Sequence, residues 1–386
     1  MDWHRERGTT KKKKKKKMAA EAGQVEEGYG RPSADQRKVP TEEARKEGRK
    51  LRVGYIPEHF ASPLLLLSRT PWGEANLELV SQPAGTGQVL TSFDASSAEG
   101  QKIDVAIALT EALIAGIAKG RQDLKLVGSY VKTPLVWAVS TGTSPQAEKY
   151  QSIDDLRGTT LGISRVGSGS QIMASVMALQ RSWPTGGEGA AEEGGISFHI
   201  DNTFPSLRSS VNTGRTSAFM WETFTTKPFY DSGEVRKIGE VPTPWPSWTI
   251  AASTNTALAS LPSRALLDDF LHRLQGAIVD FTSQESLRES RPEEFIIEEL
   301  GYQRKDVEDW LKTVRWVGDG RGSVPDTPTL GQTTSTATVS RQVLIQTLQT
   351  LQKAGVLTSA QAEGDGADPS LFIDPWGNGD VGRLVE

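Results

Sequence analysis

Apolar runs of strand length alternate with apolar patterns of helical period from residue 51 onward. The run LRVGYI (51–56) is followed by SPLLLL (62–67), which begins with serine and proline, residues that favour a helix N-terminus. IDVAIAL (103–109) is followed by TEALIAGIAKG (110–120), which a glycine ends. This alternation predicts parallel strands joined by right-handed crossovers, the arrangement of a doubly wound α/β layer.

The alternation of strand and helix restarts further along the chain. PLVWAVS (134–140) is a β-prone run, and TTLGISR (159–165) is a second one that leads into a glycine–serine turn and a helix. TSAFMWE (216–222) is another apolar run, and it ends on a carboxylate. The pattern therefore predicts a second α/β unit of the same kind as the first.

One more strand and a long helix follow the second unit. WTIAAS (248–253) is the strand, and apolar residues then recur at spacings of three and four over 263–281, which is typical of an amphipathic helix. We therefore expect an α/β fold of two doubly wound lobes, joined by crossing strands near Val136 and Trp248, with a ligand cleft between the lobes.

Composition adds boundaries to this picture. The polar residues before 51, with scattered Gly and Pro, predict disorder, and a Ser/Thr-rich stretch after 320 predicts a linker. We expect a disordered basic head over 1–50, a first lobe over 51–135 and 250–320, a second lobe over 136–249, a linker over 321–338, and a C-terminal helix and tail over 339–386.

Charge is distributed unevenly between the head and the body. Residues 1–50 hold 16 Lys and Arg against 9 Asp and Glu, a balance of +7, and the remaining residues hold 28 against 39, a balance of −11. An acidic body disfavours nucleic-acid binding, which depends on Lys and Arg that neutralise phosphates. We therefore expect no nucleic-acid partner.

The run Lys11–Lys17 is the most unusual feature of the head. No apolar segment of the length that a secretory signal needs follows it, and no window holds 18 apolar residues, so we expect neither export nor a membrane span. We expect a cytoplasmic protein with a solvated tail. The alternative is a nuclear location directed by the lysine run.

Cysteine and histidine counts limit the chemistry. The chain has no cysteine, which excludes disulfides, thiolate metal sites, iron–sulfur clusters and a cysteine nucleophile. Its four histidines are scattered, and no HExxH, Ser/His/Asp or paired-carboxylate motif is present. We therefore assign no metal, no cofactor and no catalytic residue.

In open α/β sheets, ligands bind where strands end and helices begin. In the first unit these turns contain Glu58 and His59, the segment Gly85–Gly87 with Thr86 at its centre, and Thr110. They are candidates for contact with a ligand. His59 has an alternative role, which is packing at the end of its strand.

The turn RVGSGSQ in the second unit is richer in Gly and Ser than a helix cap requires. Ser168, Gly169 and Ser170 precede a helix whose first N–H groups lack partners, so the turn could hold a sulfonate, phosphate or carboxylate. The alternative is that a serine only caps the helix. The turn lacks the third glycine of a dinucleotide-binding loop and the lysine of a P-loop.

Aromatic and acidic residues complete the candidate site. Trp221 and Trp248 could stack on a flat heterocycle or a cation, although most tryptophans are packing residues. Glu222 follows an apolar strand directly, where a carboxylate faces either a cleft or a lysine, and Lys227 is close enough in sequence to be its partner.

The order of elements resembles the type 2 periplasmic substrate-binding-protein fold, in the subgroup of the sulfonate, taurine and nitrate receptors and the thiamine pyrimidine-precursor proteins. The last two of the four stretches that carry the resemblance are similar to a cytosolic, mostly fungal branch without an export signal. The stretches are LRVGYIPEHFASPL (51–64), IDVAIALTEALIAGIAKG (103–120), SIDDLRGTTLGISRVGSGSQIMA (152–174) and TSAFMWETFTTKPFYDSGEVRKIGEVPTPWPSW (216–248).

The resemblance implies a bilobed receptor that closes on a small ligand and, in the cytosol, has no transporter to serve. By position, the implied cleft residues are Glu58, His59, Gly85, Thr86, Gly87, Thr110, Ser168, Gly169, Ser170, Trp221, Glu222 and Trp248. Our leading hypothesis is binding of a small anionic or heterocyclic metabolite. The alternatives are an enzyme of pyrimidine-precursor or sulfur-compound metabolism and a protein-interaction role with a vestigial cleft. The thiamine-pyrimidine synthases, however, need cysteines that this chain lacks.

Overall fold

The computed structural model describes residues 49–94, 96, 102–185, 192–322, 335–363, 367–376 and 381–386. Two expected segments lie outside the described residues. They are the disordered head, apart from Arg49 and Lys50, and residues 323–334 of the linker. Within these ranges, no helix combines the length and the apolar character needed to span a bilayer.

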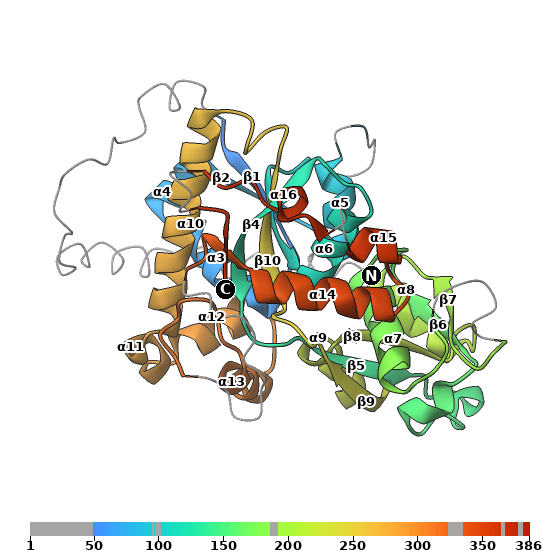
Figure 1. Ribbon diagram of the computed structural model, residues 1–386. Helices are drawn as coiled ribbons and strands as arrows, with labels where there is room; N and C mark the ends of the chain where they lie inside the picture. The colour runs from blue at the N-terminus through green and yellow to red at the C-terminus, as the bar shows by residue number, and fades with distance from the viewer. Residues whose placement is uncertain are drawn as a thin grey trace. The chain divides into compact units, whose positions relative to one another are not determined.

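The first sheet has five strands in the order β2-β1-β3-β10-β4. β1 is parallel to both β2 and β3, whereas β10 runs antiparallel to its neighbours β3 and β4 (Figure 1). The strands are β1 (Leu51–Tyr55), β2 (Leu77–Ser81), β3 (Val105–Leu109), β4 (Leu124–Val131) and β10 (Trp248–Ser253).

The second sheet repeats this plan in the order β7-β6-β8-β5-β9. β6 is parallel to β7 and β8, whereas β5 runs antiparallel to its neighbours β8 and β9. The strands are β5 (Val136–Thr141), β6 (Thr160–Ile163), β7 (Ser197–Ile200), β8 (Ala218–Glu222) and β9 (Arg236–Pro242).

Each sheet therefore contains one antiparallel strand, β10 in the first and β5 in the second, and these are the two strands that cross between the lobes. These two strands enter their sheets directly from the other lobe. The rule of right-handed crossovers applies only to strands joined through a helix within one sheet, so it did not govern their direction. The fold class itself, two α/β lobes with helices on mixed sheets, is confirmed.

Helices cover the faces of both sheets. Figure 1 shows α3 and α10 on one side of the first sheet and α5 and α6 on the other. The helices of the lobes are α3 (Ser62–Leu67), α4 (Pro71–Asn76), α5 (Thr86–Phe93), α6 (Thr110–Ala118), α7 (Gly169–Gln180), α8 (Phe204–Asn212), α9 (Thr223–Asp231), α10 (Leu261–Thr282), α11 (Gln284–Arg288), α12 (Arg291–Leu300) and α13 (Arg304–Thr313), with short 3₁₀ turns at His59–Ala61, Pro145–Ala147 and Ile153–Leu156.

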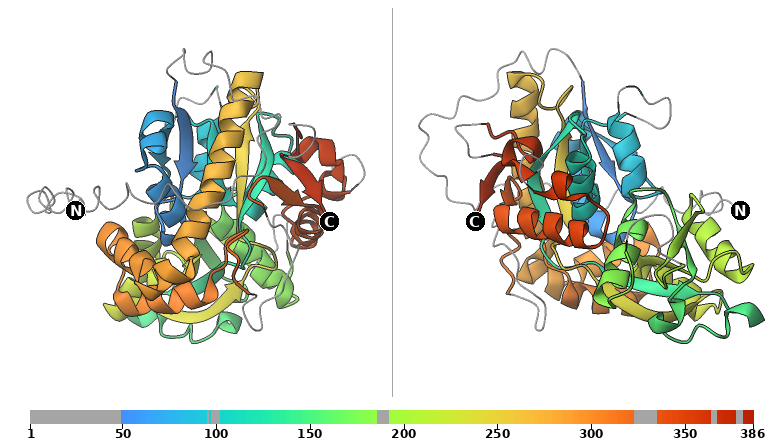
Figure 2. Two further views of the ribbon diagram at one scale, coloured as in Figure 1. Left: turned by 90° about the vertical axis from the view of Figure 1, so that its left-hand side faces the viewer. Right: turned by 45° about the vertical axis from the view of Figure 1, so that its right-hand side comes forward.

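The long helix α10 follows the apolar spacing of its sequence. Figure 2 shows it lying along the first sheet, and its apolar residues at spacings of three and four are fully or almost fully buried. They are Leu267, Phe270, Leu271, Leu274, Ile278 and Phe281. The prediction of an amphipathic helix here is confirmed.

The two crossing segments are hydrogen-bonded to each other. Ser247 donates to the Thr133 carbonyl from its N–H (3.1 Å) and from its Oγ (2.7 Å). Thr243 N–H donates to the Leu135 carbonyl (2.9 Å), and Leu135 N–H donates to Thr243 Oγ1 (3.0 Å). Both connections between the lobes are therefore tied together at this pair of segments, which we call the hinge.

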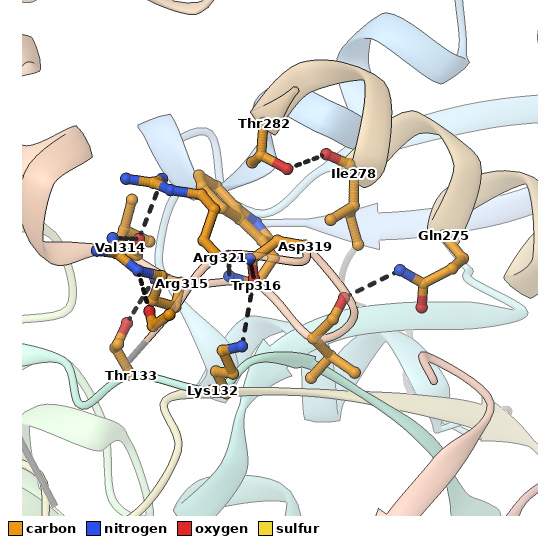
Figure 3. Close-up of polar contacts among 12 residues, drawn as sticks. Lys132, Thr133, Gln275, Ile278, Thr282, Val314, Arg315, Trp316, Asp319 and Arg321 are labelled. Carbon is orange, nitrogen blue, oxygen red and sulfur yellow. Dashed lines mark hydrogen bonds and ion pairs between the residues drawn. The ribbon is translucent and has the colours of Figure 1, made fainter. Parts of the chain in front are cut away.

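The buried carboxylate of Asp319 fixes one end of the hinge (Figure 3). It accepts hydrogen bonds from the N–H groups of Trp316 and Arg321, both at 3.0 Å, and pairs with Lys132 Nζ at 3.2 Å. Arg315 N–H also donates to Thr133 Oγ1 at 3.2 Å. These contacts anchor the segment after α13 to the end of β4.

Asp319→Ala is expected to lower the free energy of unfolding by about 3 kcal/mol, because it leaves two backbone N–H groups and a lysine without their acceptor. Urea unfolding followed by circular dichroism measures the change. Asp309→Ala is the matched control, because Asp309 pairs with lysines on an exposed helix face, so its removal should change the free energy of unfolding far less. Equal losses in the two variants would contradict the prediction.

The C-terminal segment packs across both lobes. It contains the parallel strands β11 (Thr338–Ser340) and β12 (Arg383–Val385) and the helices α14 (Arg341–Lys353), α15 (Ser359–Ala362) and α16 (Pro369–Phe372). α14 contacts α6 of the first lobe and α7 of the second (Figure 1). Its Gln346 Nε2 also donates to the Pro244 carbonyl in the hinge, at 3.4 Å.

Candidate functional site

A cavity of about 30 Å³ lies between the two lobes, at the ends of strands from both sheets. This volume has room for about two water-sized molecules, so a larger ligand requires the lobes to open. Nine of the twelve residues that the sequence singled out line the cavity: Glu58, Gly85, Thr86, Ser168, Gly169, Ser170, Trp221, Glu222 and Trp248.

The other three lie close to the cavity without lining it. His59 is buried behind it, and Gly87 faces the side chain of Arg165 from the opposite lobe. Thr110 Oγ1 shares a hydrogen bond of 2.7 Å with Thr249 Oγ1 and borders a separate cavity of about 20 Å³. For these three, the structure gives a packing role and no contact with the interlobe cavity.

The lobes approach each other closely at Gly169. A Cβ atom built on this glycine would lie 2.5 Å from Leu109 Cδ1 of the first lobe and 2.9 Å from the ring of Trp137. At Gly87, a Cβ atom would lie 3.2 Å from Arg165 Cδ across the same interface. The structure therefore shows a closed arrangement that depends on small residues where the lobes meet.

The glycine–serine turn caps α7 and also lines the cavity. Ser168 is the N-cap of α7, where its Oγ accepts from Gln171 N–H at 3.4 Å and donates to the Arg165 carbonyl at 2.7 Å. Ser170 Oγ accepts from Ser164 N–H at 3.1 Å. Both serines also line the cavity, so the capped end of α7 lies beside it with the positive end of the helix dipole.

Three tryptophans form much of the cavity wall. Trp221 stacks on Phe204 with ring centroids 4.9 Å apart, so it packs within its lobe as well as facing the cavity. Trp137 and Trp248 are 4% and 3% exposed, and the Nε1 of each has no hydrogen-bond partner among the described residues. Two residues that line the cavity therefore have buried N–H donors without an acceptor among the described residues.

The carboxylates of Glu58 and Glu222 come from opposite lobes. Glu58 follows β1 of the first lobe, and Glu222 ends β8 of the second, where it caps α9 by accepting from Thr225 N–H at 2.6 Å. Burial, and then the charge of Glu222, raise the pKa of Glu58 to about 8. Burial raises the pKa of Glu222 to about 7.

Of the two alternatives for Glu222, the structure shows the carboxylate at the cavity and no ion pair with Lys227. Lys227 pairs with Asp231 at 2.7 Å and with Asp306 at 3.2 Å, because it lies on the exposed side of α9. Instead, Glu222 Oε1 lies 3.8 Å from His59 Nε2. Burial lowers the pKa of His59 to about 3, so this imidazole is neutral at pH 7 and supplies no charge to the carboxylate.

Four lining residues were missed by the sequence predictions. They lie on the strands or at their ends, and their apolar or small side chains carry no local signal of a site. They are Ile56, Leu109, Leu135 and Ser164, and Trp137 on β5 lines the cavity too. The part of the chain that the structure describes holds no cluster of three or more His, Asp or Glu side chains placed to bind a metal ion.

Glu111, next to Thr110, connects α6 to the hinge. It is fully buried, and its Oε2 accepts from Trp245 Nε1 at 2.8 Å. Burial raises its pKa to about 7, so its protonated form stabilises the fold at low pH, and this stability is lost as the pH rises from about 4.5 through about 7.

Glu111→Gln should remove this pH dependence, because an amide never ionises. Between pH 5 and pH 8, we expect the free energy of unfolding of the variant to rise by about 2 kcal/mol relative to that of the parent protein. Urea unfolding at each pH measures this difference. Glu240→Gln, at an exposed position on β9, should instead follow the parent profile. The prediction is wrong if the free energy of unfolding changes with pH in the same way in Glu111→Gln and in the parent protein.

Comparisons with known proteins agree with this architecture. The family model described as Ca3427-like PBP matches residues 137–241. The structure of the CA3427 gene product of Candida albicans, described as defining a family with the generic periplasmic binding protein fold, is 31% identical, with a TM-score of 0.66 over 84% of this chain and 94% of that one. A comparison with curated protein sequences gave no match.

More distant structures share the fold alone. The alkanesulfonate-binding protein SsuA of Xanthomonas axonopodis pv. citri, bound to MOPS, is 17% identical, with a TM-score of 0.55 over 81% of this chain and 95% of that one. The periplasmic nitrate-binding protein NrtA of Synechocystis PCC 6803 is 13% identical, with a TM-score of 0.55 over 81% and 84%. The resemblance to type 2 periplasmic binding proteins is confirmed, and at 31% identity over most of both chains this protein belongs to the Ca3427-like family of that fold.

Proposed function

We propose that this protein binds a small anionic or heterocyclic metabolite by closing its two lobes on it, without changing the ligand covalently. The observation that carries this proposal is the cavity between the lobes, which is lined by fourteen residues from both lobes, nine of them singled out by the sequence at strand ends and helix starts. Such positions are where open α/β sheets bind ligands.

The individual side chains support binding of an anion or a flat ring. The first turn of α7 brings a positive dipole end and small side chains to the cavity, and Trp137 and Trp248 bring N–H donors without acceptors. The rings of Trp137, Trp221 and Trp248 offer faces on which a heterocycle can stack. SsuA bound to MOPS and the nitrate-binding protein show that the fold accommodates small ligands in other proteins.

A thermal-shift screen with purified protein tests the proposal. The panel contains sulfonates, pyrimidines, phosphates and amino acids, and calorimetry gives the affinity of each compound that raises the unfolding temperature. We expect at least one of the four classes to raise the unfolding temperature. If none of them does, the proposal is wrong. Mass spectrometry of the incubated panel detects conversion of a compound, which would favour the enzyme alternative.

Closure can be measured independently of affinity. The chain has no native cysteine, so spin labels attached at Lys119→Cys in the first lobe and Glu148→Cys in the second are unique. We expect a bound ligand to narrow the distance distribution between the labels, because it holds the lobes at one separation. A cytoplasmic location stays a prediction, and a nuclear location directed by the run Lys11–Lys17 is its alternative. Imaging of the tagged protein distinguishes the two.

A further inference from the structure

Two polar contacts join the lobes outside the cavity. Lys227 Nζ on α9 of the second lobe lies 3.2 Å from Asp306 Oδ1 on α13, which packs on the first lobe. Thr225 Oγ1, also on α9, shares a hydrogen bond of 3.0 Å with the hydroxyl of Tyr302, which lies between α12 and α13. None of these four residues lines the cavity, and we call them the clasp.

Each half of the clasp is fixed to its own lobe. α9 packs against β5, β8 and β9 of the second sheet. On the other side, α12 packs against α3 and α10, and the ring of Trp310 on α13 lies against Phe60, with centroids 5.2 Å apart. A movement that opens the lobes at the cavity therefore separates the two halves of the clasp.

The ion pair of the clasp stabilises the closed arrangement. Asp306 is 4% exposed, and a buried carboxylate that loses its cation is costly. Lys227 also pairs with Asp231 on its own helix, at 2.7 Å, so the second lobe holds the ammonium group in position for Asp306. Separation of the lobes leaves Lys227 with a partner but takes the cation away from Asp306. The pair therefore favours closure through contacts that no ligand makes.

The clasp is also connected to the cavity wall. Thr225 N–H donates to Glu222 Oε2 at 2.6 Å, and Glu222 lines the cavity. The ring of Tyr302 packs edge-on against His59, with centroids 4.8 Å apart, and His59 follows the cavity residue Glu58. The contacts of the clasp and the cavity wall therefore form together when the lobes close.

We propose that the clasp sets the balance between open and closed lobes, so that Lys227 and Asp306 control access to the cavity without touching the ligand. A contact made only in the closed state shifts this balance toward closure by its own free energy, whatever occupies the cavity. The inference goes beyond the proposed function and does not depend on the identity of the ligand, because it concerns the lobes alone.

A single engineered cysteine measures how often the cavity opens. The chain has no cysteine, so iodoacetamide can modify only the introduced thiol. Ser164 lines the cavity and is 2% exposed, so Ser164→Cys should react when the lobes open. Val53 on β1 is fully buried, so Val53→Cys should react only when the first lobe unfolds. At low reagent concentration, each rate follows the population of the reactive state.

Loss of the ion pair should open the cavity more often. Asp306→Asn and Lys227→Met are each expected to raise the labelling rate of Ser164→Cys about tenfold, because one member of the pair is buried and the other is partly exposed. Tyr302→Phe removes one hydroxyl of the clasp and should raise the rate about threefold. Asp231→Asn is the matched control, because it removes the other partner of the same lysine and should change the rate less than about twofold.

Two further measurements distinguish a clasp from a general loss of stability. Because Lys227 and Asp306 form one pair, their double substitution should give no higher labelling rate than the faster single variant. Val53→Cys should react far more slowly than Ser164→Cys in the parent protein and in each variant. A purely structural role would speed the reaction of Val53→Cys and leave that of Ser164→Cys unchanged.

Three results would overturn the inference. One is a parent-like rate of Ser164→Cys in both Asp306→Asn and Lys227→Met, and another is a double variant in which the two single effects multiply. The third is equal rates of Ser164→Cys and Val53→Cys in the parent protein, because the lobes then do not open before the chain unfolds. None of these measurements uses a ligand, so failure of the screening panel to bind overturns the proposed function alone.

Discussion

Gly169→Leu is expected to weaken the binding of any ligand of the interlobe cavity by about 10- to 100-fold, which corresponds to overpacking by about 1–3 kcal/mol. Even a Cβ atom at this position lies 2.5 Å from Leu109 Cδ1 and 2.9 Å from the ring of Trp137. Because Leu109 belongs to the other lobe, opening the lobes relieves part of this clash. Calorimetry measures the affinity, and the spin-label distance reports the lobe separation, which should increase.

Gly276→Leu is the matched control for this experiment. A Cβ atom on Gly276, within α10, has no other atom within 4 Å, so the same substitution should change neither the affinity nor the distance between the lobes. An affinity of Gly169→Leu within twofold of the parent value would remove the first turn of α7 from the candidate site.

Gly128→Ala is expected to cause the largest loss of stability, at least about 4 kcal/mol, which exceeds the effect of most single substitutions. Gly128 lies on β4, and a Cβ atom there would lie 1.7 Å from the Thr336 carbonyl oxygen. Since the obstacle is backbone, no rotamer change relieves the clash, and the chain that leads into β11 and α14 must move.

Two measurements separate the consequences of Gly128→Ala. Urea unfolding gives the total loss of stability, and limited proteolysis shows whether the segment from residue 335 onward has left the lobes. Gly276→Ala should stabilise the protein by up to about 1 kcal/mol, because it replaces a helical glycine in open space. Parent-like stability and protease resistance of Gly128→Ala would contradict the close packing of Thr336 on β4.

Local pattern was sufficient to predict the two lobes and much of the cavity wall. Strand runs such as residues 103–109 and the spacing of apolar residues in α10 are properties of short windows, and they identified their elements correctly. Residues at strand ends meet at one edge of a sheet, so Glu58, Ser168 and Glu222 could be placed together before any contact was known.

Long-range contacts account for what the sequence did not reveal. The direction of β10 depends on which neighbours it joins, and these are distant in the chain. Whether Trp137 faces the cavity depends on the orientation of β5 in its sheet, which the run PLVWAVS does not specify. Lys227 was near Glu222 in sequence, but the turn of α9 points it toward Asp231 and Asp306.

The position of β10 between β3 and β4 has a consequence for synthesis on the ribosome. The second sheet is built from one continuous stretch, residues 136–242, whereas the first sheet is incomplete until residues 248–253 have emerged. Domains fold as units while the chain grows, and a gap in a sheet leaves strand edges exposed to wrong partners. The lobe that is translated second should therefore be the first to complete its sheet, and the N-terminal lobe should depend on chaperones for longer.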